Sequence, residues 1–341
     1  MGFTKPIEQY LFSNSLTKIH VLMYLKDIIR GNKIMKRIVI TGATSMIGVA
    51  LIKEAIENNI EVLAIVRENS PRKNRLPKSN LIRIIECDIE TLNKFPDMNE
   101  KYDVFYHFAW NYTDRKGRND PKMQAQNIAN TLEAVELAKR LGCQKFIGAG
   151  SQAEYGIVQE KISSDTMTNP NTPYGIAKNT AGNMSKIMCE QLDMQFVWGR
   201  IFSVYGCLDN EGTMINYAID QFIEGKEAKF SSALQMWNYL NEKDAGKIFY
   251  LLGKSKEATG IYCIANKESM PLRKYIEIIK TTFGESAKCN FASEDLQKKK
   301  VTLDADIDKL QSDINFVPEI TFEQGIKEVI EYRKTKYTRG K

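Results

Sequence analysis

The segment KRIVITGATSMIG, residues 36–48, decides the fold, because it joins a β-branched strand to a helix through a turn bounded by glycines. Gly42 permits a tight turn, and Gly48 lets the helix pack closely against the strand. The helix start then offers free N–H groups and its positive dipole end to a pyrophosphate. We predict a dinucleotide site whose turn contacts come from Gly42, Thr44, Ser45, Met46, Ile47 and Gly48.

This turn departs from the usual pattern at its middle position, where Ser45 replaces a glycine. The N–H and hydroxyl of a serine can still approach a phosphate, so the departure weakens the motif without excluding it. From this segment alone, an ordinary strand-to-helix turn is the alternative interpretation.

Residues 36–147 continue as short β-branched runs that alternate with helical segments. This alternation indicates right-handed βαβ units and an α/β fold with a doubly wound parallel sheet, the Rossmann fold. The predicted strands are 37–40, 61–66, 81–87, 104–108 and 145–149, and the predicted helices are 48–57 and 124–141.

Beyond this region we expect a helix from Tyr174 to about Leu192, a strand at 195–202, and then a less regular stretch. Such a tail commonly supplies the substrate side of an α/β enzyme. In the N-terminal extension, apolar residues recur at helical spacing between Lys18 and Arg30, which predicts a helix packed on the domain, on a subunit neighbour or on a membrane surface. We divide the chain into an N-terminal extension at 1–34, a dinucleotide-binding domain at 35–203 and a smaller, mainly substrate-binding α/β region at 204–341.

Composition limits the class of protein. With 43% hydrophobic residues the chain can bury a large core, yet its apolar runs are too short to span a bilayer. The first residues lack the pattern of a secretory signal, so a cytoplasmic location is expected. Six cysteines without C-x-x-C spacing favour reduced thiols, with neither disulfides nor a metal site. A net charge of +6 spread among 42 acids, without a recognition motif, argues against nucleic acid.

The end of the second strand bears on the choice of cofactor. An NAD site places an acid there to bind the ribose 2′-hydroxyl, whereas an NADP site places an arginine nearby. Arg67 ends this strand, and Arg72, Lys73 and Arg75 follow. We therefore favour NADP(H) as the cofactor. Glu68 leaves NAD(H) as the second choice, and a solvated basic loop without a ligand is the remaining interpretation of these cations.

A catalytic set is predicted from three residues. Tyr174 and Lys178 stand at i and i+4, on one face of a helix, where the ammonium is expected to lower the pKa of the phenol. Tyrosine can then exchange a proton with a carbonyl or alcohol. Ser151 follows the strand at 145–149, at the sheet edge where ligands bind, and can hold the substrate oxygen.

These features resemble the extended short-chain dehydrogenase family, also called the NAD-dependent epimerase/dehydratase family, over roughly residues 36–265. The resemblance implies that Asp88 and Ile89 contact the adenine, and that Ala109, with Trp110 beside it, lines the cofactor groove. It also implies that Lys178 holds the nicotinamide ribose. The matching segments are 41–42, 87–89, 107–110, 150–156, Tyr174 with Lys178, and 200–206, in which Phe202, Ser203 and Val204 are implied to border nicotinamide and substrate.

Members of this family mostly act on nucleotide-activated sugars and pair through helices that correspond to 124–141 and 174–192, so a nucleotide-sugar substrate and a homodimer are implied. Dehydratases of the family carry two acids after the active-site Ser or Thr, where this chain has Gln152 and Ala153. Epimerase-reductases need a cysteine, here replaced by Ala153, and a histidine, a role that neither His20 nor His107 fits. Glu154 remains a carboxylate without a chemical role, expected to be structural.

Simple hydride transfer remains, in which NADPH reduces a keto group and Tyr174 donates the proton. Segment 150–156 resembles that of nucleotide-sugar 4-ketoreductases of the abequose and paratose synthase kind. A 4-epimerase with tightly bound NAD is the nearest rival, followed by a non-catalytic NADP-sensing protein. The predicted substrate contacts are Ser151, Gln152, Arg115, Ser203 and Trp237.

Trp237 departs from the family pattern, because many relatives place an arginine there to bind the diphosphate of the sugar nucleotide. An indole can stack on a base or a sugar, or fill the core. Arg115, Lys116 and Arg118 can replace the lost charge, or belong to a solvated loop.

Overall fold

The computed structural model of the chain describes residues 35–293 and 301–339. The helix predicted between Lys18 and Arg30 lies outside these residues. Seven parallel strands form the main sheet, in the order β11-β6-β5-β4-β1-β2-β3. The strands are β1 (Arg37–Thr41), β2 (Glu61–Val66), β3 (Ile82–Glu86), β4 (Val104–His107), β5 (Lys145–Ser151), β6 (Gln195–Ile201) and β11 (Gly260–Ile264).

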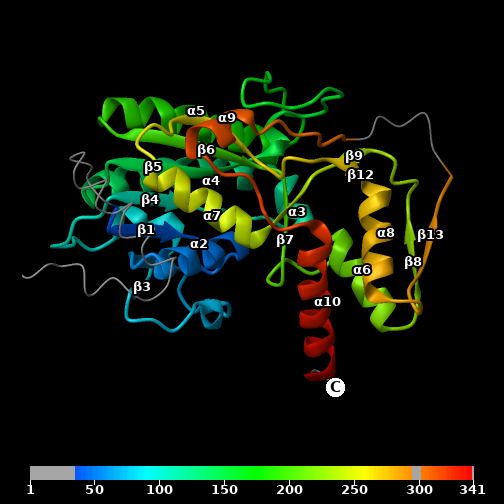
Figure 1. Cartoon of the computed structure of the whole chain (residues 1–341). Helices are drawn as coiled ribbons and strands as arrows, with labels where there is room; N and C mark the ends of the chain where they lie inside the picture. The colour runs from blue at the N-terminus through cyan, green and yellow to red at the C-terminus, as the bar shows by residue number, and fades with distance from the viewer. Residues whose placement is uncertain (1–34, 294–300, 340–341) are drawn as a thin grey trace, which may run out of the picture.

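The strand order reverses between β1 and β4, which confirms the predicted doubly wound sheet. Helices cover both faces (Figure 1). Ile38 and Ile40 of β1 pack in the core on one face and Val39 packs in the core on the other, because successive strand residues point to opposite faces. One face carries α2 (Met46–Glu57), α7 (Glu242–Lys254) and α9 (Asp308–Ile314); the other carries η3 (Ile89–Lys94), α4 (Pro121–Arg140) and α5 (Pro173–Gln191).

A smaller unit with its own core stands beside the sheet (Figure 1). It is built on α6 (Met214–Ile223), α8 (Leu272–Phe283), α10 (Phe322–Arg339) and the strand pair β8 (Glu227–Phe230) and β13 (Lys288–Phe291). Two more pairs are β7 (Ser203–Tyr205) with β10 (Tyr239–Asn241), and β9 (Met236–Trp237) with β12 (Met270–Pro271). The short helical segments are η2 (Lys73–Arg75), α3 (Arg115–Arg118) and η4 (Gln152–Glu154).

The boundary expected at residue 203 does not divide the molecule in space. β11 pairs with β6 at the edge of the main sheet, and α7 packs against α2. Gly246 of α7 has no room for a side chain, because a Cβ there would lie 2.6 Å from the backbone of Ala50. Residues 242–264 therefore belong to the nucleotide-binding unit, and the smaller unit is formed by the segments on either side.

Several predicted elements change their bounds by one to three residues, among them a helix and a strand beside the site. The helix predicted at 124–141 begins at Pro121, because Asp120 caps it by accepting the N–H groups of Lys122 and Met123. The strand predicted to reach Phe202 ends at Ile201, and the chain then turns into β7.

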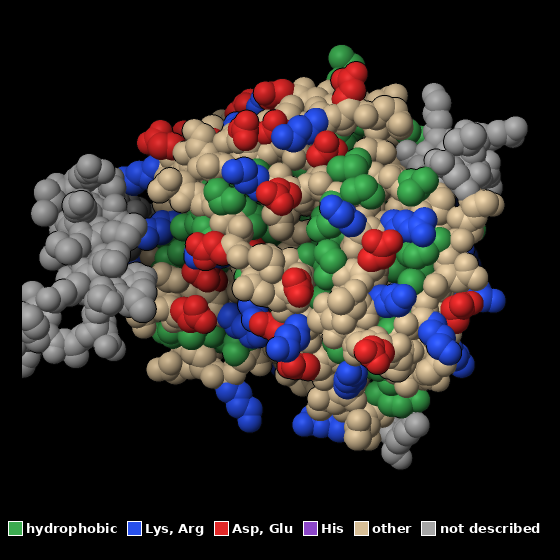
Figure 2. Space-filling model, turned by 45° about the vertical axis from the view of Figure 1, so that its right-hand side comes forward, with side chains coloured by type: hydrophobic (Ala, Val, Ile, Leu, Met, Phe, Trp, Pro, Cys, Tyr) green, Lys and Arg blue, Asp and Glu red, His purple; other side chains and the backbone are tan. Residues whose placement is uncertain are grey.

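The described residues contain no helix that is both long and apolar enough to cross a bilayer. They also bring together no group of three histidine, cysteine or acidic side chains that could hold a metal ion. All six cysteines have free thiols. On the face shown in Figure 2, acidic and basic side chains are interspersed.

Candidate active site

The glycine-rich turn after β1 depends on the absence of side chains. Gly42 has a φ of 70°, and a Cβ there would lie 2.6 Å from the backbone nitrogen of Ala109. A Cβ on Gly48 would lie 2.5 Å from the carbonyl oxygen of Gly42. Only glycine at both positions lets the turn pass the end of β4 and lets α2 start against it.

The start of α2 leaves donors for an anion. Ser45 caps the helix, since its Oγ accepts the N–H of Gly48 at 3.0 Å. Its own N–H donates to the Gly42 oxygen at 2.9 Å, so the prediction that this N–H reaches a phosphate is wrong, and only the hydroxyl proton remains. The N–H groups of Met46 and Ile47 donate to no acceptor among the described residues. They are the two amides that can bind a phosphate.

A cavity of about 200 Å³ opens over this turn, at the carboxyl ends of the parallel strands. Phe108, Ala149 and Ile201 line it from the ends of β4, β5 and β6. Open α/β sheets bind their ligands at this edge. Its other lining residues are Ser45, Met46, Ile47, Arg72, Arg75, Leu208, Asp209 and Asn210.

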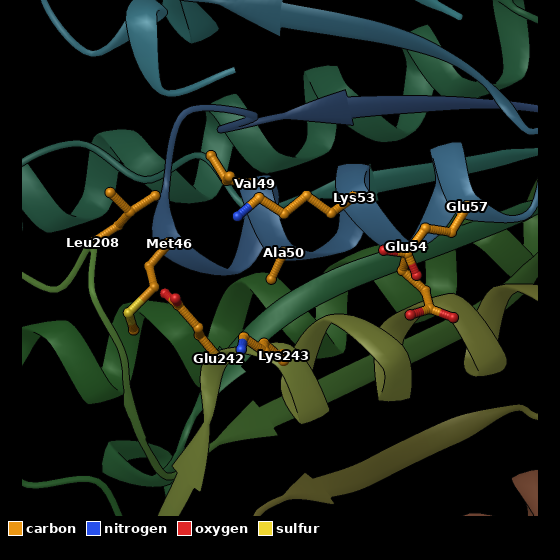
Figure 3. A pocket seen from close by; sticks show the side chains of 9 residues that line it. All are labelled: Met46, Val49, Ala50, Lys53, Glu54, Glu57, Leu208, Glu242 and Lys243. Atoms are coloured by element: carbon orange, nitrogen blue, oxygen red, sulfur yellow. The ribbon is translucent and has the colours of Figure 1, made fainter. Parts of the chain in front are cut away.

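A larger cavity of about 300 Å³ lies between α2 and α7 (Figure 3), and Met46 and Leu208 line both cavities. Lys53 and Glu54 line it from α2, and Glu242 and Lys243 from α7. Neither cavity is lined by Ser151, Tyr174 or Lys178. We place the chemistry at the smaller cavity, because Ala149, which lines it, accepts a hydrogen bond from the Lys178 Nζ at 2.7 Å.

The four cations after β2 differ in their partners. Lys73 forms an ion pair with Glu86 at 2.5 Å. Arg72 donates to the Asn210 side chain at 3.4 Å, Arg75 donates to the Leu208 carbonyl at 3.3 Å, and Arg67 is exposed. Burial and the neighbouring Arg72 lower the pKa of Arg75. In residues 35–293 and 301–339, no carboxylate forms an ion pair with these three arginines.

The predicted adenine site has a matching polar atom. Asp88 follows β3, and its Oδ1 is buried without a hydrogen-bond partner in the described part of the chain. A buried acceptor without a donor costs free energy unless a ligand supplies one, and the amino group of adenine is such a donor. Ile89 begins η3 beside it, and Ala109 and Trp110 follow β4. These residues fit a dinucleotide.

Local sequence places the tyrosine and the lysine. Thr172 caps α5 by accepting the N–H of Gly175 at 3.1 Å, and Pro173 is the first helical residue. Tyr174 therefore lies in the first turn and Lys178 one turn later. Ser151 is the last residue of β5, and its hydroxyl faces the phenol closely enough to lower the pKa of Tyr174.

The expected action of Lys178 on the phenol is not among the main influences on the pKa of Tyr174, although Nζ lies 6.0 Å from the tyrosine ring centroid. This Nζ donates to the carbonyl of Ala149 at 2.7 Å and lies 3.6 Å from the centroid of the Trp110 ring. Burial lowers the pKa of Lys178 to about 7. Burial also raises the pKa of Tyr174, and the strongest opposing effect comes from Arg118, whose guanidinium lies 3.9 Å from the tyrosine ring centroid. Arg118 is thus the cation that most lowers the pKa of Tyr174, while the Ala149 carbonyl holds the Lys178 Nζ.

Gln124 holds the loop that carries Trp110 and Arg118, a role that the sequence did not reveal. Its Oε1 accepts the indole N–H of Trp110 at 2.9 Å, and its Nε2 donates to the carbonyls of Tyr112 and Gly117, both at 3.0 Å. Tyr112 adopts a φ of 59°, which is strained for a bulky residue. Such strain is maintained only where surrounding contacts fix the backbone.

The predicted substrate residues are only partly brought together. Gln152 and Ser203 are half-buried at the ends of β5 and β6, near Ser151. Arg115 is exposed, and it is Arg118 that reaches Tyr174. Trp237 packs between the core of the main sheet and that of the smaller unit.

The residues after β6 that are implied to border nicotinamide and substrate differ in burial. Phe202 is buried, and its N–H donates to the Ile264 carbonyl at 3.1 Å, while Val204 is half-buried in β7. His107 is also buried, and burial lowers its pKa to about 3, so it is neutral. It bonds Thr41 at 2.8 Å and serves structure rather than proton transfer.

Comparison with known proteins identifies the family. The sequence model of the NAD dependent epimerase/dehydratase family matches residues 38–265. The chain belongs to this family. It is accordingly an NAD(P)-dependent enzyme, and the match contains the glycine-rich turn, Ser151, Tyr174 and Lys178.

Relatives within the family differ in reaction. The UDP-glucuronate 4-epimerase of Thermodesulfobacterium geofontis is 26% identical over 270 residues, which cover 77% of this chain and 83% of that one. The CDP-abequose synthase of Salmonella muenchen is 22% identical over 312 residues, covering 88% and 98%. The crystal structure of UDP-glucuronic acid 4-epimerase from Bacillus cereus in complex with NAD covers 89% of this chain and 98% of its own, with a TM-score of 0.75 and 22% identity. That structural likeness supports the Rossmann fold.

Proposed function

We propose that this family member reduces a keto group on a nucleotide-activated sugar with NADPH, the sugar being a 4-keto-6-deoxy sugar. The observation that carries the proposal is the group of Arg67, Arg72 and Arg75, which form no ion pair with a described carboxylate. They follow β2, where an NADP site requires cations for the 2′-phosphate. The similarity to CDP-abequose synthase supports the same reaction class.

Each residue of the site has a role in this proposal. The N–H groups of Met46 and Ile47 bind the diphosphate, Asp88 accepts from the adenine, and Arg67 binds the 2′-phosphate. The bound cofactor supplies a hydride to the carbonyl carbon.

The catalytic residues act on the carbonyl oxygen. Tyr174 donates its phenolic proton to the keto oxygen, which becomes a hydroxyl, while Ser151 holds this oxygen. Lys178, anchored on the Ala149 carbonyl, binds the nicotinamide ribose. A phenol is protonated at neutral pH at its ordinary pKa, and burial raises the pKa of Tyr174 further, so its proton is present for donation.

The preference for NADPH over NADH tests the role proposed for Arg67, Arg72 and Arg75. We expect NADPH to bind at least about 10-fold more tightly than NADH, and Arg67→Ala to remove most of this preference, since a charge-assisted contact to the 2′-phosphate is lost. Titration followed by nicotinamide fluorescence measures both. Lys73→Ala is the matched control, because Lys73 already pairs with Glu86 and should leave the preference unchanged. Equal affinities, or NAD retained on purification, would contradict the proposal.

A second candidate is an NAD-dependent 4-epimerase. The UDP-sugar 4-epimerases among the relatives, and the NAD-bound structure from Bacillus cereus, favour it. Ser151, Tyr174 and Lys178 would then oxidise and re-reduce one carbon, so the cofactor would stay bound between turnovers.

A homodimer is part of the proposal. α5 exposes Ile176 at 51%, Met184 at 43% and Ile187 at 56%, and their spacing puts them along one helix face. α4 packs beside α5, so a second copy of the same pair of helices can cover this stripe.

A cytoplasmic location also stays a prediction.

Charges on the α5 stripe are expected to separate the dimer. Ile176→Glu combined with Ile187→Glu places four carboxylates in the interface of two copies, so light scattering should show a monomer. Met167→Glu is the control, because Met167 is 86% exposed and lies outside α5. A wild-type protein that is monomeric at micromolar concentration would rule the proposal out.

A further inference from the structure

Glu154 is a fully buried carboxylate that the proposed chemistry does not use. Its exposed fraction is 0%, and a buried charge is tolerated only when paired and hydrogen-bonded. Oε1 accepts the backbone N–H of Ser151 at 2.7 Å and the indole N–H of Trp198 at 3.0 Å. Oε2 accepts Nε of Arg200 at 2.7 Å. Both oxygens thus accept hydrogen bonds from the protein, and the side chain has no exposed surface that a ligand could touch.

The contact with Ser151 forms one half of a capping box. Ser151 Oγ accepts the N–H of Ala153 at 3.2 Å, while the Glu154 side chain returns to the N–H of Ser151. The two bonds fix the backbone of Ser151 at the end of β5. With one lone pair of the hydroxyl engaged, its proton is left to donate to another oxygen.

The partners of Glu154 are themselves fixed by packing. A Cβ on Gly148, Gly150 or Gly182 would lie 2.2, 2.3 or 2.8 Å from the Trp198 indole, so the ring fills the space that three glycines leave. Arg200 lies with its guanidinium 4.6 Å from the ring centroid of Tyr155. In the register of β5 and β6, Gly148 is opposite Trp198 and Gly150 opposite Arg200. A rigid network therefore runs from β6 to the end of β5.

We infer that Glu154 is a positioning residue for the proposed reaction: anchored by Arg200 and Trp198, it holds the Ser151 backbone so that the serine hydroxyl meets the keto oxygen. This inference rests on the proposed function, in which Ser151 holds that oxygen. Displacement of a catalytic group by about 1 Å can cost about 100-fold in rate, so the precision of this support matters.

Two double variants separate positioning from simple loss of the ion pair. Glu154→Gln with Arg200→Met keeps an oxygen acceptor for the Ser151 N–H, whereas Glu154→Leu with Arg200→Met removes it. Neither variant leaves a buried charge without a partner, because both replace Glu154 and Arg200 together. We expect the glutamine variant to keep kcat within about 10-fold of the wild type and the leucine variant to lose about 100-fold, both with unchanged cofactor affinity.

Hydrogen exchange of the peptide 148–156 provides a readout that needs no substrate. Protection of the Ser151 amide should persist in the glutamine variant and disappear in the leucine variant. Asp220→Asn is the control for losing an ion pair elsewhere, because Asp220 pairs with Arg333 at 2.6 Å in the smaller unit and should leave kcat unchanged.

Equal kcat values in the two double variants, or full Ser151 protection in the leucine variant, would overturn the inference. If the wild type epimerises sugars instead of reducing them, the proposed function fails but the comparison remains valid. The same variants are then ranked by epimerisation rate and by Ser151 protection.

Discussion

Tyr174→Phe is expected to lower turnover about 10³-fold while leaving cofactor affinity nearly unchanged, because general acid catalysis supplies rate enhancements of this size. The substitution removes only the hydroxyl. The ring keeps its contacts with Arg118, at 3.9 Å, and with Trp110, whose centroid lies 6.1 Å away. Single-turnover oxidation of NADPH with a keto sugar nucleotide measures the rate, and fluorescence titration measures the affinity.

A matched control distinguishes lost chemistry from lost stability. Tyr102→Phe also removes one hydroxyl, from a buried ring. This hydroxyl donates to Glu100 at 3.2 Å and lies at the opposite end of the parallel strands from Ser151. We expect this variant to keep full activity. If Tyr174→Phe retained turnover within about 10-fold of the wild type, Tyr174 would not be the proton donor.

Lys178→Met is expected to abolish turnover and yet to stabilise the protein. Lys178 is 4% exposed, and burial lowers its pKa to about 7 from an ordinary 10.5. The unfolded chain therefore binds more protons than the folded one between these two pH values, so the free energy of unfolding rises with pH in this window. The cost of burying the ammonium is full below about pH 7 and vanishes above 10.5.

The pH dependence of unfolding tests this prediction. Methionine carries no charge, so the variant should exceed the wild type by a few kcal/mol near pH 6, an upper estimate that loss of the Ala149 hydrogen bond reduces, and by nothing near pH 10.5. Lys145, whose pKa burial lowers to about 8, gives the same trend in both proteins and cancels in the difference. Thermal unfolding at several pH values measures it. A variant less stable than the wild type at pH 6 would show that the buried ammonium is not costly.

The sequence predicts the fold well where local pattern decides it. The turn at 42–48 with its flanking β-branched and amphipathic runs predicts the sheet, and the Thr-Pro pair before Tyr174 marks the start of α5. The return of β11 to the main sheet is not visible locally, because five apolar residues do not reveal which strand they pair with. For this reason the boundary predicted at residue 203 does not follow the spatial division of the molecule.

In the candidate site, too, local sequence predicts some features and misses those that depend on distant parts of the chain. Spacing along one helix brings Tyr174 and Lys178 to one face, but it does not show that the Ala149 carbonyl and Trp110 hold the ammonium. Arg118 reaches the phenol only through the loop that Gln124 fixes. These contacts depend on tertiary structure, and they set the electrostatics of the site.

The proposed activity is net reduction of a sugar nucleotide by NADPH. The most direct test is to incubate the protein with NADPH and a nucleotide-linked 4-keto-6-deoxy sugar, following nicotinamide absorbance and product NMR together. We predict that one NADPH is consumed for each new sugar hydroxyl. Interconversion of nucleotide sugars without net consumption of NADPH would contradict the claim and establish the epimerase instead.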